Sequence, residues 1–96
     1  MENVLKTYVI ERPLPGAGKL DAKGLEGLST KSNSVLRELG PDVQWVHSYV
    51  TGDKIYCVYR AKNPEIVREH ARCGGFPAQE INLVSAMIDP TTGQIG

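Results

Sequence analysis

The chain has 96 residues, of which 41% are hydrophobic and 23% are charged, a balance that excludes an intrinsically disordered protein and suits one hydrophobic core. The basic and acidic residues number 11 each, so a nucleic-acid partner is not expected. No run approaches the roughly 18 apolar residues of a membrane span, and the first residues lack the pattern of a signal peptide. We therefore expect residues 1–96 to form a single cytoplasmic domain with no membrane partner.

The first predicted element is a strand that runs from Leu5 to Arg12. Tyr8 and Ile10 fall on one of its sides and alternate with residues that fall on the other, which is the two-residue period of a strand with one buried face. Pro13 ends the run. A loop rich in glycine and proline follows over residues 13–18.

A helix is predicted over residues 22–39. Asp21 suits its N-cap, because a carboxylate there accepts hydrogen bonds from the unpaired N–H groups of the first turn. Apolar residues recur at offsets of three, four and seven, the spacing of one helix face, and Gly40 followed by Pro41 stops the helix. This apolar face consists of Leu25, Leu28, Val35, Leu36 and Leu39.

Two runs rich in β-forming residues, 43–50 and 55–60, predict a β-hairpin around the turn TGDK. Val50 then pairs with Ile55, and this register assigns alternate residues to opposite faces of the sheet. The face toward the helices is expected to carry Val46, Ser48, Val50, Ile55, Cys57 and Tyr59. The opposite face is expected to carry Trp45, His47, Tyr49, Tyr56, Val58 and Arg60.

A second helix is predicted to begin at Pro64 with Asn63 as its N-cap, because proline suits the first helical position, where its missing N–H costs nothing. Gly74 and Gly75 end this helix, and a last strand is predicted over Ile81–Ile88. The inward stripe of the helix is expected to consist of Ile66, Val67, His70 and Ala71.

The order strand, helix, strand, strand, helix, strand in a chain of this length predicts an α+β fold. We expect a ferredoxin-like βαββαβ sandwich, in which a four-stranded antiparallel sheet carries two helices on one face. Such a sheet leaves its other face open, and a monomer rarely leaves so many aromatic side chains in water. We therefore expect the open sheet face to meet a second copy of the chain in a homodimer, a ligand, or both.

Four residues are candidates for metal binding. His47 lies among aromatic residues of the open face, where a histidine serves as a metal ligand, as an acid or base, or only as a packed, hydrogen-bonded group. His70 falls on the inward stripe beside Glu69, and it either coordinates a metal while a carboxylate orients it or simply bonds a carbonyl. Cys57 is either a buried inert thiol or, together with His70, a soft ligand pair for nickel, copper or zinc.

Three segments carry a resemblance to a known family, namely QWVHSYVTGDKIYCVY (44–59), REHARCGGFP (68–77) and IDPTT (88–92), with YVIER near the start. The chain resembles a family of small bacterial proteins of uncharacterised function, some members of which are described as nickel-binding. The resemblance runs from about residue 6 to 92. It implies a ferredoxin-like fold, a dimer and, in some members, surface nickel binding suited to sequestration or detoxification. The histidines within the matched motifs, His47 and His70, are the candidate ligands.

Three functional hypotheses follow. The first is a non-enzymatic, homodimeric protein that sequesters nickel without an organic cofactor, and its expected ligands are His47, His70, Glu69 and Cys57. The second is a dimeric α+β barrel enzyme or small-molecule carrier. Its pocket would lie on the open sheet face, lined by Trp45, His47, Tyr49 and Tyr56. The third is a structural dimer in which Trp45 anchors the interface.

Overall fold

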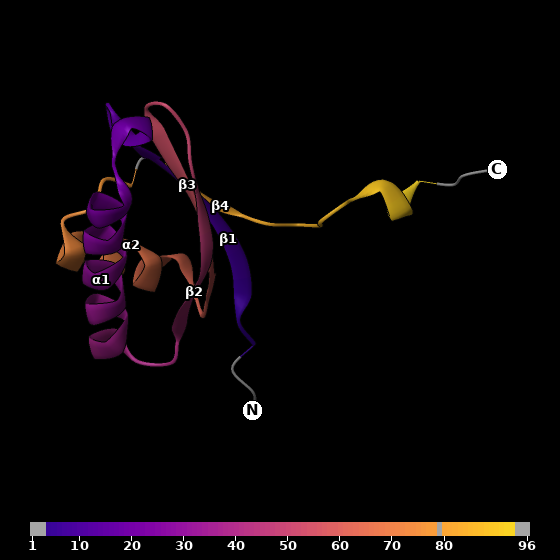
Figure 1. Ribbon diagram of the computed structural model, residues 1–96. Coiled ribbons are helices and arrows are strands. Elements are labelled where there is room, and N and C mark those ends of the chain that lie inside the picture. The colour runs from indigo at the N-terminus through magenta and orange to yellow at the C-terminus, as the bar shows by residue number, and fades with distance from the viewer. Residues whose placement is uncertain (1–3, 79, 94–96) are drawn as a thin grey trace.

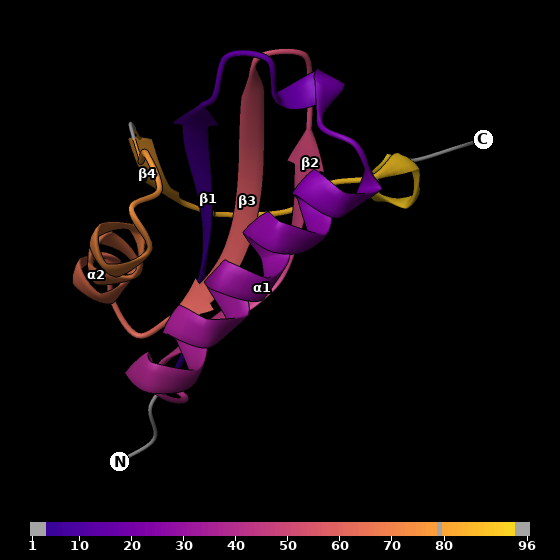
Figure 2. The same ribbon diagram turned by 60° about the vertical axis from the view of Figure 1, so that its left-hand side comes forward.

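The computed structural model describes residues 4–78 and 80–93 and confirms the ferredoxin-like α+β fold. Its elements are β1 (Lys6–Pro13), α1 (Ala22–Leu39), β2 (Val43–Val50), β3 (Lys54–Ala61), α2 (Pro64–Gly74) and β4 (Glu80–Leu83), with short 3₁₀ turns at Ala17–Lys19 and Pro90–Thr92. The strands form an antiparallel sheet in the order β2-β3-β1-β4. Both helices cover the same face of this sheet (Figure 1; Figure 2).

Both helices have the caps that the sequence predicts. Asp21 Oδ1 accepts a hydrogen bond from Gly24 N at 2.8 Å, and Asn63 Oδ1 accepts one from Ile66 N at 3.0 Å. Gly75 ends α2 with a φ of 70°, in the left-handed region where glycine alone pays no steric cost. Within the described residues, neither helix is both long and apolar enough to cross a membrane.

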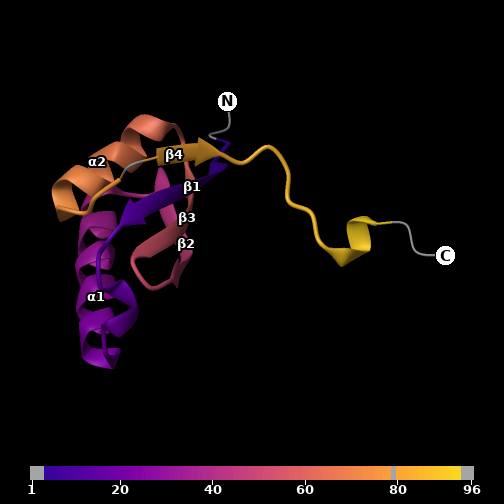
Figure 3. The same ribbon diagram turned by 90° about the horizontal axis from the view of Figure 1, so that it is seen from above.

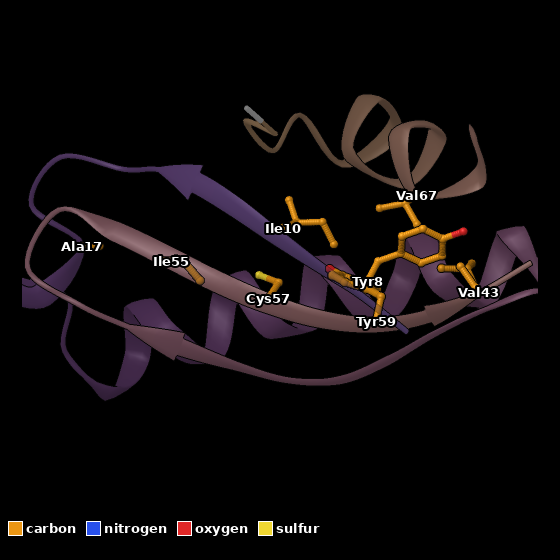
Figure 4. Packing of buried hydrophobic residues seen from close by; sticks show 9 residues of the cluster. Tyr8, Ile10, Ala17, Val43, Ile55, Cys57, Tyr59 and Val67 are labelled. Atoms are coloured by element: carbon orange, nitrogen blue, oxygen red, sulfur yellow. The ribbon is translucent and has the colours of Figure 1, made fainter. Parts of the chain in front are cut away.

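The core lies between the helices and the inner face of the sheet (Figure 4). The central strands β1 and β3 place Tyr8 opposite Tyr59 and Ile10 opposite Cys57, and Val67 of α2 packs onto this row from above. All of these side chains are at most 5% exposed. Full burial of a large apolar side chain stabilises a fold by about 1.5–3 kcal/mol, so this row anchors both helices to the sheet.

The hairpin departs from the prediction through a β-bulge at Val46. Trp45 pairs with Tyr59 and His47 pairs with Val58, so Val46 is an extra residue without a partner. The bulge leaves Val46 49% exposed and brings Trp45 to the helix-facing side. The predictions that Trp45 lies on the open face and Val46 on the inner face are therefore wrong, because strict alternation holds only in a strand without a bulge.

The last strand is shorter than the predicted Ile81–Ile88, because β4 ends at Leu83. Val84 N still donates to Thr7 O at 2.9 Å. The register places Lys6, the first residue of β1, opposite Ser85, so the residues after Ser85 lie past the end of β1 and have no strand to pair with. Residues 85–93 instead extend away from the sheet on the side opposite the helices (Figure 1; Figure 3). We call this segment the C-terminal arm.

Candidate functional site

The open sheet face carries an accessible histidine among aromatic and aliphatic side chains. Tyr49 pairs with Tyr56 and His47 pairs with Val58 across the hairpin, as predicted. The rings of His47 and Tyr49 meet edge to face with their centroids 5.0 Å apart. Both side chains are exposed, Tyr49 by 60%. This surface therefore presents an imidazole to solvent, to a ligand or to a second copy of the chain.

Trp45 does not belong to this surface. Its Nε1–H donates to Ser48 Oγ at 2.9 Å, and both side chains are half-buried on the helix-facing side of β2. A pocket on the open face, as the enzyme or carrier hypothesis requires, therefore lacks one of its four predicted lining residues. An interface anchored by Trp45 through the open face is excluded for the same reason.

His70 of α2 is fully buried on the helix-facing side of the sheet. Its Nε2 lies 3.1 Å from Ser32 Oγ, its ring stacks on Phe76 at 5.4 Å, and it tilts against Tyr59 at 5.1 Å. Burial, followed by the charge of Arg12, lowers the pKa of His70 to about 4, so the imidazole is neutral at pH 7. Its Nδ1 has no hydrogen-bond partner among the described residues.

Cys57 lies beside a buried cation that the sequence reasoning missed. Arg12 is only 4% exposed and donates from Nε to Cys57 Sγ at 3.3 Å, and from its terminal nitrogens to Pro77 O at 2.8 Å and Tyr59 Oη at 3.4 Å. The guanidinium also stands over the rings of Tyr59 and Phe76, at 5.7 and 5.6 Å. The sequence contains a signal for the burial of Arg12, because Arg12 follows Tyr8 and Ile10 in the two-residue period of the buried side of β1.

Glu69 lies on the solvent side of α2. Its carboxylate pairs with Arg72 and lies 3.5 Å from the thiol of Cys73 one turn later. The hydrogen bond from Arg72, followed by the one from Cys73, lowers the pKa of Glu69. Cys73 is exposed. Glu69 and Cys73 thus offer an oxygen and a sulfur donor at i,i+4 spacing, a pair that the sequence reasoning did not identify.

The four predicted metal ligands lie in three separate places. His47 is on the open face, Cys57 and His70 are buried under the helices, and Glu69 is outside α2. Within residues 4–78 and 80–93, no three His, Cys, Asp or Glu side chains are grouped so that they could hold one metal ion. A divalent cation at Cys57 would also meet the positive charge of Arg12, which disfavours it there. His47 and Glu69 are the accessible members of the set.

The strand order and the two helices on one sheet face define a ferredoxin-like α+β domain with a histidine on its open face. Residues 8–84 match the family described as nickel responsive protein SCO4226-like, and the chain belongs to that family. The crystal structure of SCO4226 from Streptomyces coelicolor A3(2) aligns with a TM-score of 0.72 and 16% identity, over 85% of this chain and 99% of that chain. At this identity the likeness shows the fold alone. No curated protein matches the chain significantly.

Proposed function

We propose that the chain is a cytoplasmic, non-enzymatic homodimer that binds nickel on its surface and sequesters it. The observation that carries this proposal is the match of residues 8–84 to the nickel-responsive family. Imidazole is a ligand that suits nickel, and thiolate and carboxylate groups complete the range of donors that proteins offer to transition metals. The exposed His47 is the first candidate ligand, and Glu69 with Cys73 is the second, available to a metal once Arg72 moves off the Glu69 carboxylate.

A second copy of the chain increases the number of ligands at one ion. In a twofold dimer the same surface of each subunit faces its own copy, so a residue near the axis meets its symmetry mate. His47 lies on the open sheet face, through which we propose that the dimer forms. Two His47 side chains, one from each subunit, would then supply two nitrogen ligands. Under this proposal His70 and Cys57 contribute only after their contacts with Ser32 and Arg12 break.

Exposed apolar surface supports association through the open face. Val58 and Tyr56 in the middle of this face are half-buried, and Tyr49 beside them is exposed. The C-terminal arm leaves Met87 83% and Ile88 77% exposed, and it extends on the same side of the sheet (Figure 3). Burial of apolar surface contributes about 25 cal/mol per Å². A second copy that covers the face and receives the arm removes both apolar surfaces from water.

Nickel titration by calorimetry of the tag-free protein tests the metal-binding proposal. We expect His47→Ala to weaken nickel binding about tenfold or more, because it removes a direct ligand. A Glu69→Gln, Cys73→Ser double variant should remove a separate class of site. Cys57→Ser is the matched control, because its buried sulfur faces Arg12 and its loss should leave nickel binding unchanged. Undiminished binding when His47 and His70 are both alanine would overturn the two histidines as ligands.

Sedimentation velocity at several protein concentrations tests the dimer. We expect the wild-type chain to sediment as a dimer and Val58→Lys to sediment as a monomer, because an unpaired charge at the centre of an interface is costly. Ser34→Lys introduces the same residue at an exposed position of α1 and should leave the dimer intact. A wild-type monomer at all concentrations, or a Val58→Lys dimer, would contradict association through the open face.

A further inference from the structure

A cavity of about 90 Å³ that is partly open to solvent lies between α1 and the β2–β3 hairpin, on the side of the sheet opposite His47. It exists because the inner side of α1 carries Ser29 and Ser32 where longer apolar side chains would fill the space. Its walls are mainly apolar, and Trp45 and the sulfur-bearing Cys57 also border it. The apolar wall residues include Leu25, Leu28, Val50 and Ile55.

Arg12 lines this cavity and brings to it a positive charge with no carboxylate partner among the described residues. Its three hydrogen-bond acceptors are the sulfur of Cys57, the hydroxyl of Tyr59 and the carbonyl of Pro77. A guanidinium has five N–H donors, so two remain for another acceptor. A buried charge without a counterion costs several kcal/mol. An anion in the cavity would provide the missing counterion and the missing acceptors.

The other lining residues favour an anion of low charge over a cation. None of the twelve residues that line the cavity, all in the described part of the chain, is Asp or Glu. Besides Arg12, the polar groups available to a ligand are mainly the hydroxyls of Ser29, Ser32 and Ser48. One cation surrounded by apolar walls balances one negative charge, whereas a dianion would remain half-compensated in surroundings that solvate charge poorly.

We propose that this cavity binds a short-chain monocarboxylate, with its carboxylate on Arg12 and its small tail between α1 and the hairpin. The guanidinium suits this group, because its planar fork matches a carboxylate. A dry cavity of about 150 Å³ accepts benzene, which has six heavy atoms. A cavity of about 90 Å³ whose mouth opens to solvent therefore suits an acid with about four to six heavy atoms, such as propionate or butyrate, with part of the larger acids lying in the mouth. So few atoms limit the expected Kd to the micromolar to millimolar range.

The position of Trp45 provides a direct readout, because it is the single tryptophan of the chain and borders the cavity. Titration of the full chain with butyrate should change the fluorescence of Trp45 with saturation and should shift the indole N–H resonance in NMR spectra. Butyramide has nearly the same shape without the charge, and inorganic phosphate is a small anion without the apolar tail. We expect butyrate to bind at least about tenfold more tightly than either compound, because butyramide lacks the charge that strengthens hydrogen bonds to Arg12 and phosphate lacks the tail that the apolar walls would cover.

Three variants locate the binding. Arg12→Met should weaken butyrate binding about tenfold or more, whereas Arg60→Met, at an exposed position on the opposite sheet face, should leave it unchanged. Ser29→Phe should abolish binding by filling the cavity while Arg12 stays in place, which covers the case in which Arg12→Met fails to fold. Equal binding of butyramide, tighter binding of phosphate, or undiminished binding by Ser29→Phe would overturn the proposal. So would the absence of a response to carboxylates up to about 20 mM. The proposal and its test are independent of nickel.

Discussion

Lowering the pH from 7.5 to 5.5 is expected to destabilise the fold through His70. Burial, helped by the charge of Arg12, lowers the pKa of this imidazole from 6.5 to about 4. The folded state therefore holds the neutral form, and the unfolded chain binds the proton more strongly. The stability that depends on a neutral His70 is fully present above pH 6.5 and is lost as the pH falls below that value. The loss levels off near pH 4.

The linkage relation converts this pKa difference into a free energy. Between the two pKa values the free energy of unfolding falls by about 1.4 kcal/mol per pH unit. From pH 7.5 to 5.5 the loss due to His70 alone is about 1 kcal/mol, because the imidazole of the unfolded chain titrates over only the lower half of this interval. The interval ends at pH 5.5 so that carboxylates, whose reference pKa values are about 4, contribute little.

Urea unfolding at the two pH values, followed by far-UV circular dichroism, measures this loss. His70→Gln removes the titrating group but keeps a polar side chain, and it should lose much less stability on acidification than the wild-type chain. His47→Gln is the matched control, because it makes the same substitution outside the core and leaves the buried His70 in place, so the loss that depends on His70 should remain. If His70→Gln were as sensitive to pH as the wild-type chain, buried neutral His70 would not be the cause and the reasoning would be refuted.

Two further predictions concern the helices, and both are checked by chemical denaturation. Gly74→Ala should lower the free energy of unfolding by about 1–3 kcal/mol, because a Cβ atom there would lie 2.2 Å from Phe76 Cε2, whose ring cannot shift without leaving the stack with His70. In Gly27→Ala of α1 the added Cβ atom meets no atom within 4 Å, so this substitution should instead raise the free energy of unfolding by about 0.5–1 kcal/mol. Equal effects of the two substitutions would contradict the argument from the contact with Phe76. Asp21→Ala should cost about 1 kcal/mol by removing the N-cap of α1, and Asp21→Asn should restore most of this loss.

The sequence predicted the helices well because their signals are local. Asp21 and Asn63 cap the first turns, Gly40 and Gly75 end the helices, and apolar spacing identifies the buried faces, so each element can be derived from about a dozen neighbouring residues. The end of β4 depends instead on where β1 begins, which is a distant part of the chain. A pattern within residues 81–88 therefore cannot show that only the first few of them have a neighbour to pair with.

The candidate sites were only partly predictable for a similar reason. Period and register correctly placed His47 on the open face and Cys57 and His70 under the helices. They did not show that Arg12 donates to Cys57 and to the carbonyl of Pro77, which lies 65 positions away in the sequence. Such a contact arises only when the loop after α2 folds back onto the end of β1, and no local pattern encodes it.

The bulge at Val46 determines how the two proposed sites share β2. Trp45 and His47 are two positions apart, so in a regular strand they would lie on the same face. The extra residue between them turns Trp45 toward the cavity under α1 and leaves His47 on the open face. One irregular residue thus separates the surface proposed for association and metal binding from the partly open cavity proposed for a small anion. Because the sheet lies between His47 and the cavity, substitutions at either place can be tested without touching the other.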